Sequence, residues 1–472
     1  MAVEERRGAR LVMHARLWAA ATALLIFFFV LAGFQAYWQL VAGPWLMAQP
    51  YDHTAAARVK LVQPGSVITR DGVKILGPAR ANGSWSYKYE RPEEFAHLLG
   101  YNEQTGLRGA LTSALLGQGA YEDWHARLAS PVPQGCDVVL TIDSNAQKAA
   151  FEALRGYSGC ALAVRTNDGA VVAAASSPGF DPIDLGDNEN TTVLTNDPAQ
   201  PLLDRPVEGL YNPGWGMAWV TAAAALASRD ARVTTGLTCA GRYEIDDHKI
   251  VCPAAHGAVT VASALEQGCL VGITQSAERL GPVRFKNFVH AAHLLDPASL
   301  AVPSQPGRMP DFTDWRGKVN LAEAALGERE TRLTPLAMAR FFLSIARGGE
   351  VIQPFLVAQV KSPSGRVVEE GKGRDLGRAM SAKVAGNMKA LMLASDRAPV
   401  TPETGRSAPS AYAAWWSPSE IMNARGDAWF VALSPTQNPT TVVLLILEDQ
   451  ADEKMAVDQG LSLLNYLEHM AV

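Results

Sequence analysis

The pattern of apolar and polar positions changes character several times along the 472-residue chain, and its first strong feature lies near the N-terminus. Residues 17–43, LWAAATALLIFFFVLAGFQAYWQLVAG, contain no charged side chain. A helix of this length spans the hydrocarbon core of a bilayer, so the pattern predicts a transmembrane anchor. The alternatives are a cleaved signal peptide, although no clean small-residue cleavage site ends the run, and a buried core helix, which rarely carries IFFF beside arginines.

The residues that precede this apolar run are rich in arginine, with Arg6, Arg7, Arg10 and Arg16. Positively charged flanks stay in the cytoplasm. The sequence therefore predicts a cytoplasmic N-terminus at residues 1–16, a single crossing of a bacterial cell membrane, and an extracytoplasmic location for the rest of the chain.

After the anchor the pattern is first irregular and then regular. Residues 44–134 contain short apolar runs between turn residues, which predicts a small, irregular membrane-proximal domain. From residue 135 on, GCDVVLTID is typical of a strand, followed by a helix that opens near residues 144–147. Two apolar runs around Asn167-Asp168-Gly169 predict a tight hairpin.

The C-terminal part shows a second hairpin pattern and a final amphipathic helix. The strand-like runs are residues 428–435 and 440–449, and the helical pattern covers residues 454–470. Alanine-rich helical stretches lie between the two hairpins, at 218–228, 261–280 and 333–346. Strands at both ends of a region with helices between them predict an α+β domain over residues 135–472, with an antiparallel sheet flanked by helices.

The composition and charge of the chain limit the classes of partner and ligand that we expect. The net charge is −5 and no Lys/Arg-rich block lies beyond the first residues, which argues against a nucleic-acid partner. Of the five cysteines, Cys239 and Cys252 are close enough in sequence to form a disulfide outside the membrane, and two buried thiols are an equal alternative. The Cys/His spacing matches no zinc motif known to us, so we expect neither a metal nor a cofactor.

Several segments, in the same order along the chain, resemble one family. They are QPGSVITRDGVKILG (63–77), YKYERPEEFAHLLGYNEQTGLRG (87–109), LLDRPVEGLYNPG (202–214) and GDAWFVALSPTQNP (426–439). Together they resemble the class B penicillin-binding proteins, which are membrane-anchored D,D-transpeptidases that crosslink peptidoglycan. The resemblance implies a transpeptidase-like fold and a role in cell-wall synthesis.

The resemblance also locates the first catalytic motif of the family, S-x-x-K. Its serine attacks the acyl carbonyl, and its lysine, one helical turn later, withdraws the proton. Aligned on the segment YNPGWGMAWVTAA, the serine position is Trp215 and the lysine position is Ala218. Neither side chain can act as nucleophile or base, and loss of a serine-type nucleophile costs on the order of 10⁶ in rate in a well-studied hydrolase.

The second motif, S-x-N, is lost in the same way. The alignment places Gly268 at the serine and Leu270 at the asparagine, with Cys269 between them. A small buried thiol is the usual role of such a cysteine, and a replacement nucleophile is the alternative.

At the third motif, K-[ST]-G, the chain has Glu403, Thr404 and Gly405. The lysine is replaced by a carboxylate, so an attraction for a substrate carboxylate becomes a repulsion of about 4 kcal/mol at ~4 Å. A displaced motif does not compensate, because no lysine in the chain follows a serine by three residues or precedes Ser-Gly or Thr-Gly.

These losses favour a membrane-anchored pseudoenzyme rather than an enzyme. The resemblance implies a multi-pass SEDS-type peptidoglycan polymerase as the partner of residues 17–43 and of the membrane-proximal region, with the chain as its scaffold or regulator. Two alternatives remain open. One is a transpeptidase with residual activity that still binds penicillin, and the other is a sensor that binds peptidoglycan fragments (muropeptides) without forming a covalent bond.

Overall fold

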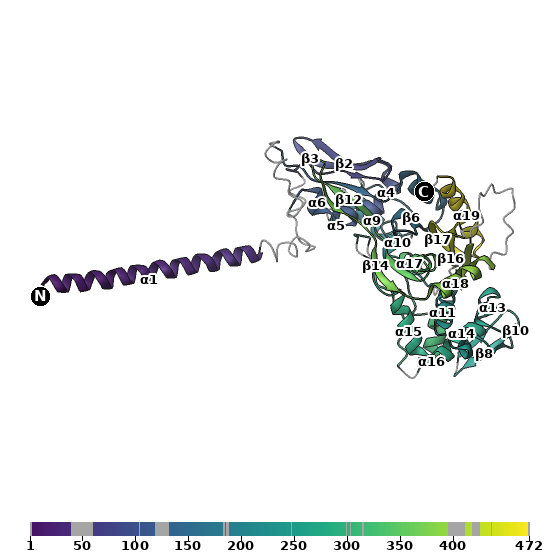
Figure 1. Cartoon of the computed structure of the whole chain (residues 1–472). Coiled ribbons are helices and arrows are strands. Elements are labelled where there is room, and N and C mark those ends of the chain that lie inside the picture. Colours follow the sequence, from purple (N-terminus) through teal and green to yellow (C-terminus); the bar gives the residue numbers. More distant parts are fainter. Residues whose placement is uncertain are drawn as a thin grey trace. The chain divides into compact units, whose positions relative to one another are not determined.

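The computed structural model describes residues 2–38, 60–102, 104–118, 132–182, 185, 188–246, 248–298, 300–302, 304–313, 316–394, 411–417, 425–435 and 437–470. The chain divides into two units, Met1–Val59 and Lys60–Val472. The first unit contains one long helix, and the second contains all the described strands (Figure 1).

The N-terminal helix α1 (Ala2–Tyr37) includes the predicted anchor. Its apolar part, Arg16–Tyr37, has a mean hydropathy of 2.3 over its most apolar window, and none of that window is buried within the protein. The helix is long and apolar enough to cross a membrane, and it fits a single-pass anchor.

A five-stranded antiparallel sheet forms the centre of the second unit, in the order β15-β16-β17-β5-β6. Its strands are β5 (Gly159–Arg165), β6 (Val171–Ser177), β15 (Ala411–Ser417), β16 (Gly426–Ser434) and β17 (Thr441–Gln450). Both predicted hairpins are present, β5–β6 around Asp168 and β16–β17. The sheet confirms the α+β prediction.

Helices cover both faces of this sheet because its central strands are apolar on both sides. Along β17, Val442, Leu444 and Ile446 belong to one buried cluster, and the alternating residues Val443, Leu445 and Leu447 belong to another. The second cluster is covered by α8 (Ser144–Ala153) and α19 (Lys454–His469), and the first by α10 (Arg205–Glu208), α11 (Trp215–Ala227), α17 (Pro335–Ala346) and α18 (Ala382–Ala394).

The helices that continue from α11 form the part of the unit that borders the site described below. They are α12 (Ala231–Thr234), α13 (Val261–Glu266), α14 (Leu270–Leu280), α15 (Pro282–Ala291) and α16 (Gly317–Leu326). Two small ribbons accompany them, β7 (Leu237–Cys239) with β10 (Gly257–Val259), and β8 (Arg242–Ile245) with β9 (His248–Val251). The helical stretch expected over 261–280 is divided, because Gly268 has a left-handed φ of 67° and Cys269 caps α14.

A six-stranded sheet crosses the boundary that the sequence predicted between residues 134 and 135. Its order is β13-β12-β4-β1-β2-β3, built from β1 (Val67–Ile68), β2 (Lys74–Ala81), β3 (Ser84–Tyr89), β4 (Asp137–Leu140), β12 (Val357–Lys361) and β13 (Val367–Glu370). Helices α4 (Pro92–Leu99), α5 (Gly106–Ala110) and α6 (Thr112–Leu115) accompany it, and β11 (Glu350–Gln353) pairs with β14 (Arg374–Arg378) in a separate ribbon. The membrane-proximal segment therefore shares its sheet with two later parts of the chain.

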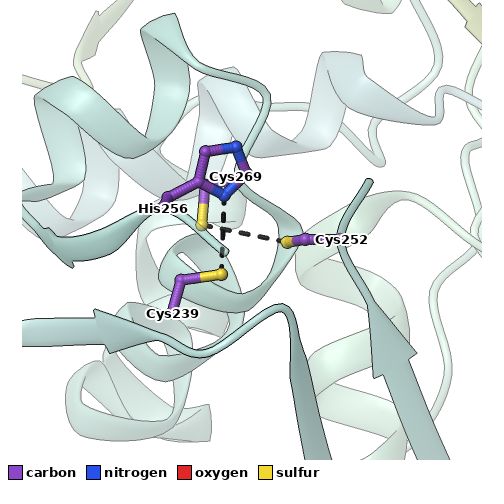
Figure 2. Close-up of side chains that lie close together, drawn as sticks. All are labelled: Cys239, Cys252, His256 and Cys269. Atoms are coloured by element: carbon purple, nitrogen blue, oxygen red, sulfur yellow. Dashed lines mark hydrogen bonds between the residues drawn. The ribbon is translucent and has the colours of Figure 1, made fainter. Parts of the chain in front are cut away.

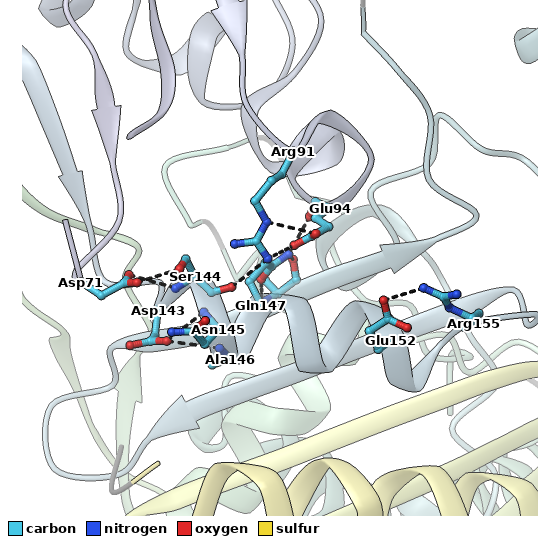
Figure 3. Close-up of polar contacts among 11 residues, drawn as sticks. Asp71, Arg91, Glu94, Asp143, Ser144, Asn145, Ala146, Gln147, Glu152 and Arg155 are labelled. Carbon is cyan, nitrogen blue, oxygen red and sulfur yellow. Dashed lines mark hydrogen bonds and ion pairs between the residues drawn. The ribbon is translucent and has the colours of Figure 1, made fainter. Parts of the chain in front are cut away.

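Polar contacts also join this segment to helix α8 (Figure 3). The buried amide of Gln147 donates to the carbonyl oxygens of Glu94 and Ala174, both at 2.9 Å, and accepts from the Ala174 N–H at 2.8 Å. At the N-terminus of α8, the carboxylate of Asp71 accepts from the Ser144 hydroxyl at 2.6 Å and from its N–H at 3.0 Å. A carboxylate at a helix N-terminus is favoured by the helix dipole as well.

The Asp71 contact predicts a pH-dependent contribution to stability. Burial raises the pKa of Asp71, but the hydrogen bonds from Ser144 lower it more, so the pKa lies below its ordinary value of 3.8. The contribution is thus complete above about pH 4 and is lost as the pH falls through the folded-state pKa. We expect Asp71→Asn to lower the melting temperature by about 1 °C at pH 7, and the difference from the native protein should shrink progressively as the pH falls below about 4. The control Asp458→Asn, at an exposed position on α19, should give no such pH-dependent difference.

Candidate functional site

The first residue of α11, Trp215, occupies the position predicted for the catalytic serine. The preceding Gly214 has a φ of 47°, and a Cβ atom on it would lie 2.2 Å from the Ser417 hydroxyl oxygen, so only glycine fits here. Trp215 is half-buried and packs against the hydrophobic core. Ala218, one turn later, is completely buried.

The second predicted motif lies at the junction of α13 and α14. Gly268 is half-buried in the connection, and Leu270 is the first residue of α14. Between them, the buried Cys269 turns away from solvent, and its sulfur accepts from the Gly272 N–H at 3.3 Å.

Trp215, Gly268 and Leu270 line one cleft with a volume of about 880 Å³. Helix α11, the α13–α14 junction, strand β15 and the start of α19 form its walls. The structure therefore brings two of the three predicted motif positions together. Ala218 is not among the described residues that line the cleft.

Strand β15 contributes two tryptophans to the lining of the cleft. Trp415 is 4% exposed, stacks on Trp429 with ring centroids 5.5 Å apart, and donates its indole N–H to the Pro213 carbonyl oxygen at 2.8 Å. A Cβ atom on Gly216 would lie 2.8 Å from the Trp415 ring, so the ring lies directly against the first turn of α11. Trp416 is 38% exposed and donates to the Gln450 carbonyl oxygen.

The third predicted motif, Glu403, Thr404 and Gly405, lies outside the described residues, and its role stays a prediction. The part of the chain that is described resumes at Ala411, six residues after Gly405, with the strand that carries Trp415 and Trp416. Sequence reasoning missed both tryptophans. The signal was available, because WW ends the short apolar run at residues 411–416, which residues 417–425 separate from the 426–434 strand.

The lining of the cleft is mostly aromatic and apolar, with a few charged side chains. The described lining residues include no serine, threonine or cysteine, and their charged members are Glu266, Asp452, Glu453 and Lys454. Three carboxylates and one ammonium group give the cleft a net negative formal charge, which disfavours a carboxylate ligand. Trp215, Trp219, Tyr412, Trp415 and Trp416 supply large aromatic surfaces.

The disulfide considered between Cys239 and Cys252 is not formed, and both residues are buried. The Cys239 sulfur instead lies 3.4 Å from Nδ1 of His256, and the Cys252 sulfur lies 3.9 Å from that of Cys269 (Figure 2). Burial raises the pKa of Cys239, but hydrogen bonds from the backbone and side chain of His256 lower it to about 6. Three sulfurs and an imidazole thus meet behind the cleft wall, which the sequence analysis did not anticipate.

Comparisons with known proteins agree with this architecture. Residues 159–460 match the protein-family description "Penicillin binding protein transpeptidase domain". The chain is 27% identical to the peptidoglycan D,D-transpeptidase PbpA of Mycolicibacterium smegmatis, over 95% of this chain and 97% of the relative. It is 22% identical to the peptidoglycan D,D-transpeptidase MrdA of Haemophilus influenzae, over 77% of this chain and 62% of the relative.

Solved structures show the same fold. Penicillin-binding protein A from M. tuberculosis, in a ceftriaxone acyl-enzyme complex, superimposes with a TM-score of 0.78 at 22% identity, covering 87% of this chain and 99% of that one. PBP2 from Pseudomonas aeruginosa, in complex with WCK 5153, gives a TM-score of 0.73 at 23% identity, covering 86% and 95%. The family match covers well over half of the chain, and the chain therefore belongs to the penicillin-binding protein transpeptidase family.

Proposed function

We propose that this protein is a membrane-anchored pseudoenzyme of peptidoglycan synthesis that acts by binding, as a scaffold or regulator of a SEDS-type polymerase. One observation carries the proposal. The cleft that corresponds to a transpeptidase site presents Trp215, Gly268 and Leu270 where the family's chemistry needs a serine, a serine and an asparagine.

The packing around the cleft supports a role that needs the fold and not the reaction. Trp415 fills the space against the first turn of α11 and is held by a hydrogen bond and by stacking on Trp429 and Phe342. A substrate carbonyl meets no serine, threonine or cysteine there among the described lining residues. The sheet and its helices nevertheless bury two large hydrophobic clusters, one on each face of the sheet.

The binding role is assigned to the membrane end of the molecule. Helix α1 offers an exposed apolar surface from Leu17 to Trp38, which suits lipid and another membrane-embedded helix. The orientation with the N-terminus in the cytoplasm rests on the arginines at 6, 7, 10 and 16. Co-purification from native membranes should recover a multi-pass polymerase, and a variant whose α1 is replaced by an unrelated apolar helix should not.

Labelling with fluorescent penicillin tests whether the protein has lost the ability to form a covalent acyl-enzyme. We expect the full-length protein in mild detergent to form no adduct that survives denaturation, at concentrations and times that label penicillin-binding protein A of M. tuberculosis. That protein serves as the positive control, because its structure has been solved as a penicillin G acyl-enzyme complex. A stable adduct on this protein would contradict the proposal, and peptide mapping of the adduct would identify its nucleophile.

A second candidate function is favoured by the volume of the cleft. A space of about 880 Å³ with aromatic walls can hold a ligand without reacting with it. If muropeptides raise the melting temperature while penicillin forms no adduct, the protein is a sensor. If neither ligand changes the protein, the scaffold role stands without a cleft ligand.

A further inference from the structure

Cys239, Cys252, His256 and Cys269 converge from four different element ends (Figure 2). Cys239 ends β7, Cys252 directly follows β9, His256 directly precedes β10, and Cys269 caps α14. One ligand atom from each residue lies within 4.8 Å of all the others. We propose that these four side chains form a structural zinc site.

The distances fit tetrahedral coordination better than a disulfide. With Zn–S bonds of about 2.3 Å and Zn–N bonds of about 2.05 Å, a tetrahedral site separates two sulfurs by about 3.8 Å and a sulfur from a nitrogen by about 3.6 Å. The structure has 3.9 Å between the sulfurs of Cys252 and Cys269, and 3.4 Å between the Cys239 sulfur and Nδ1 of His256. A disulfide needs sulfurs about 2.05 Å apart.

The surroundings suit thiolates held by a metal ion. The N–H groups of Val271 and Gly272, in the first turn of α14, point at the sulfurs of Cys252 and Cys269 at 3.4 and 3.3 Å. Free N–H groups at a helix N-terminus favour negatively charged ligands. All three cysteines are at most 5% exposed, and His256 is half-buried. Three cysteines and one histidine are a ligand set typical of structural zinc.

The proposed zinc site would also stabilise two short ribbons that have little stability of their own. The two ribbons β7–β10 and β8–β9 have strands of three or four residues. Isolated two-stranded ribbons of this size are marginally stable in water. A metal ion bound by residues at the ends of β7, β9, β10 and α14 would hold them in one arrangement.

The position of the site links it to the cleft. Cys269 lies between Gly268 and Leu270, and Cys252 precedes Pro253, and all three of these neighbours line the cleft. The zinc ion would therefore hold in place the part of the cleft wall that contains Gly268 and Leu270, the positions of the second catalytic motif. The inference does not depend on the proposed function, since an active enzyme could use the same support.

The test measures zinc in the full-length protein, purified in detergent without a metal-binding tag or chelator. We expect about one zinc per chain by elemental analysis, and replacement by Co²⁺ should give the visible absorption of a tetrahedral site with thiolate-to-metal charge transfer. Removal of the metal with a strong chelator should lower the melting temperature by on the order of 10 °C, and zinc should restore it.

Variants separate this site from other cysteines. Cys239→Ser and His256→Ala should lose the zinc, whereas Cys160→Ser, at a buried thiol outside the cluster, should keep it. His256→Cys should retain the metal with an altered Co²⁺ spectrum, which distinguishes ligation from misfolding. A native protein without zinc, or one in which non-reducing peptide mapping finds a Cys252–Cys269 disulfide, would overturn the proposal. These outcomes are independent of the penicillin assay.

Discussion

Glu448→Ala should destabilise the protein by about 3 to 5 kcal/mol, because it leaves the Arg205 guanidinium buried without its countercharge. Arg205 is 1% exposed and donates to both carboxylate oxygens of Glu448, at 2.7 and 3.2 Å. The Tyr211 hydroxyl donates to the same carboxylate at 2.6 Å. The pair ties α10 to β17, so its loss acts on the sheet next to the cleft. Urea unfolding of the full-length protein in mild detergent, followed by tryptophan fluorescence, measures the effect.

The matched control is the exposed pair of Glu152, on α8, and Arg155, just after that helix (Figure 3). These side chains are 43% and 77% exposed, so Glu152→Ala should change the free energy of unfolding by less than about 1 kcal/mol. Glu448→Gln keeps the shape and should fall between the two. Equal effects of Glu448→Ala and Glu152→Ala would show that water compensates Arg205.

Ala218→Lys, which restores the family's lysine, should cost several kcal/mol, on the order of 3 or more, in the native background. Ala218 is 0% exposed and packs in the main hydrophobic cluster, so an ammonium group there has neither space nor a partner. Trp215 lies one turn earlier on the same helix face. We therefore expect Trp215→Ser to reduce the cost of Ala218→Lys when the two are combined, as a double-mutant cycle of melting temperatures and urea midpoints would show.

The combined variant also probes the chemistry. Trp215→Ser/Ala218→Lys should still form no penicillin adduct, because Gly268 and Leu270 supply none of the polar groups of the second motif and Trp415 remains against the first turn of α11. Ala222→Lys, another buried position of α11, controls for the general cost of a buried lysine. Rapid acylation of the combined variant would show that the rest of the site is intact.

The strands and helices with strong periodicity could be read directly from the sequence. The apolar run of β17 and the turn at Asp168 predicted both hairpins, since a tight turn between two apolar runs depends on neighbouring residues alone. The division at Gly268 was missed, because the alanine-rich pattern continues through it and the left-handed glycine shows only in the backbone.

The site was predictable only as far as the resemblance reached. Trp215, Gly268 and Leu270 were found by alignment to three short motifs, and they do share one cleft. The pairing of Cys239 with His256 and of Cys252 with Cys269 could not be found in this way, because it depends on how two ribbons and a helix end meet in space. Their spacing, Cys-x12-Cys-x3-His-x12-Cys, matches no standard zinc motif and so gave no signal.

The six-stranded sheet limits how this protein can be cut into fragments or combined with its relatives in chimeras. Strand β4, which follows the predicted boundary, pairs with β1 before it, and β12 comes from more than two hundred residues later. A fragment ending at residue 134 would lack β4, which pairs with one edge of β1, and a fragment beginning at residue 135 would expose the edge of β4. The membrane-proximal segment therefore cannot be exchanged between relatives by itself. A chimera that moves it must move residues 137–140 and 357–370 with it.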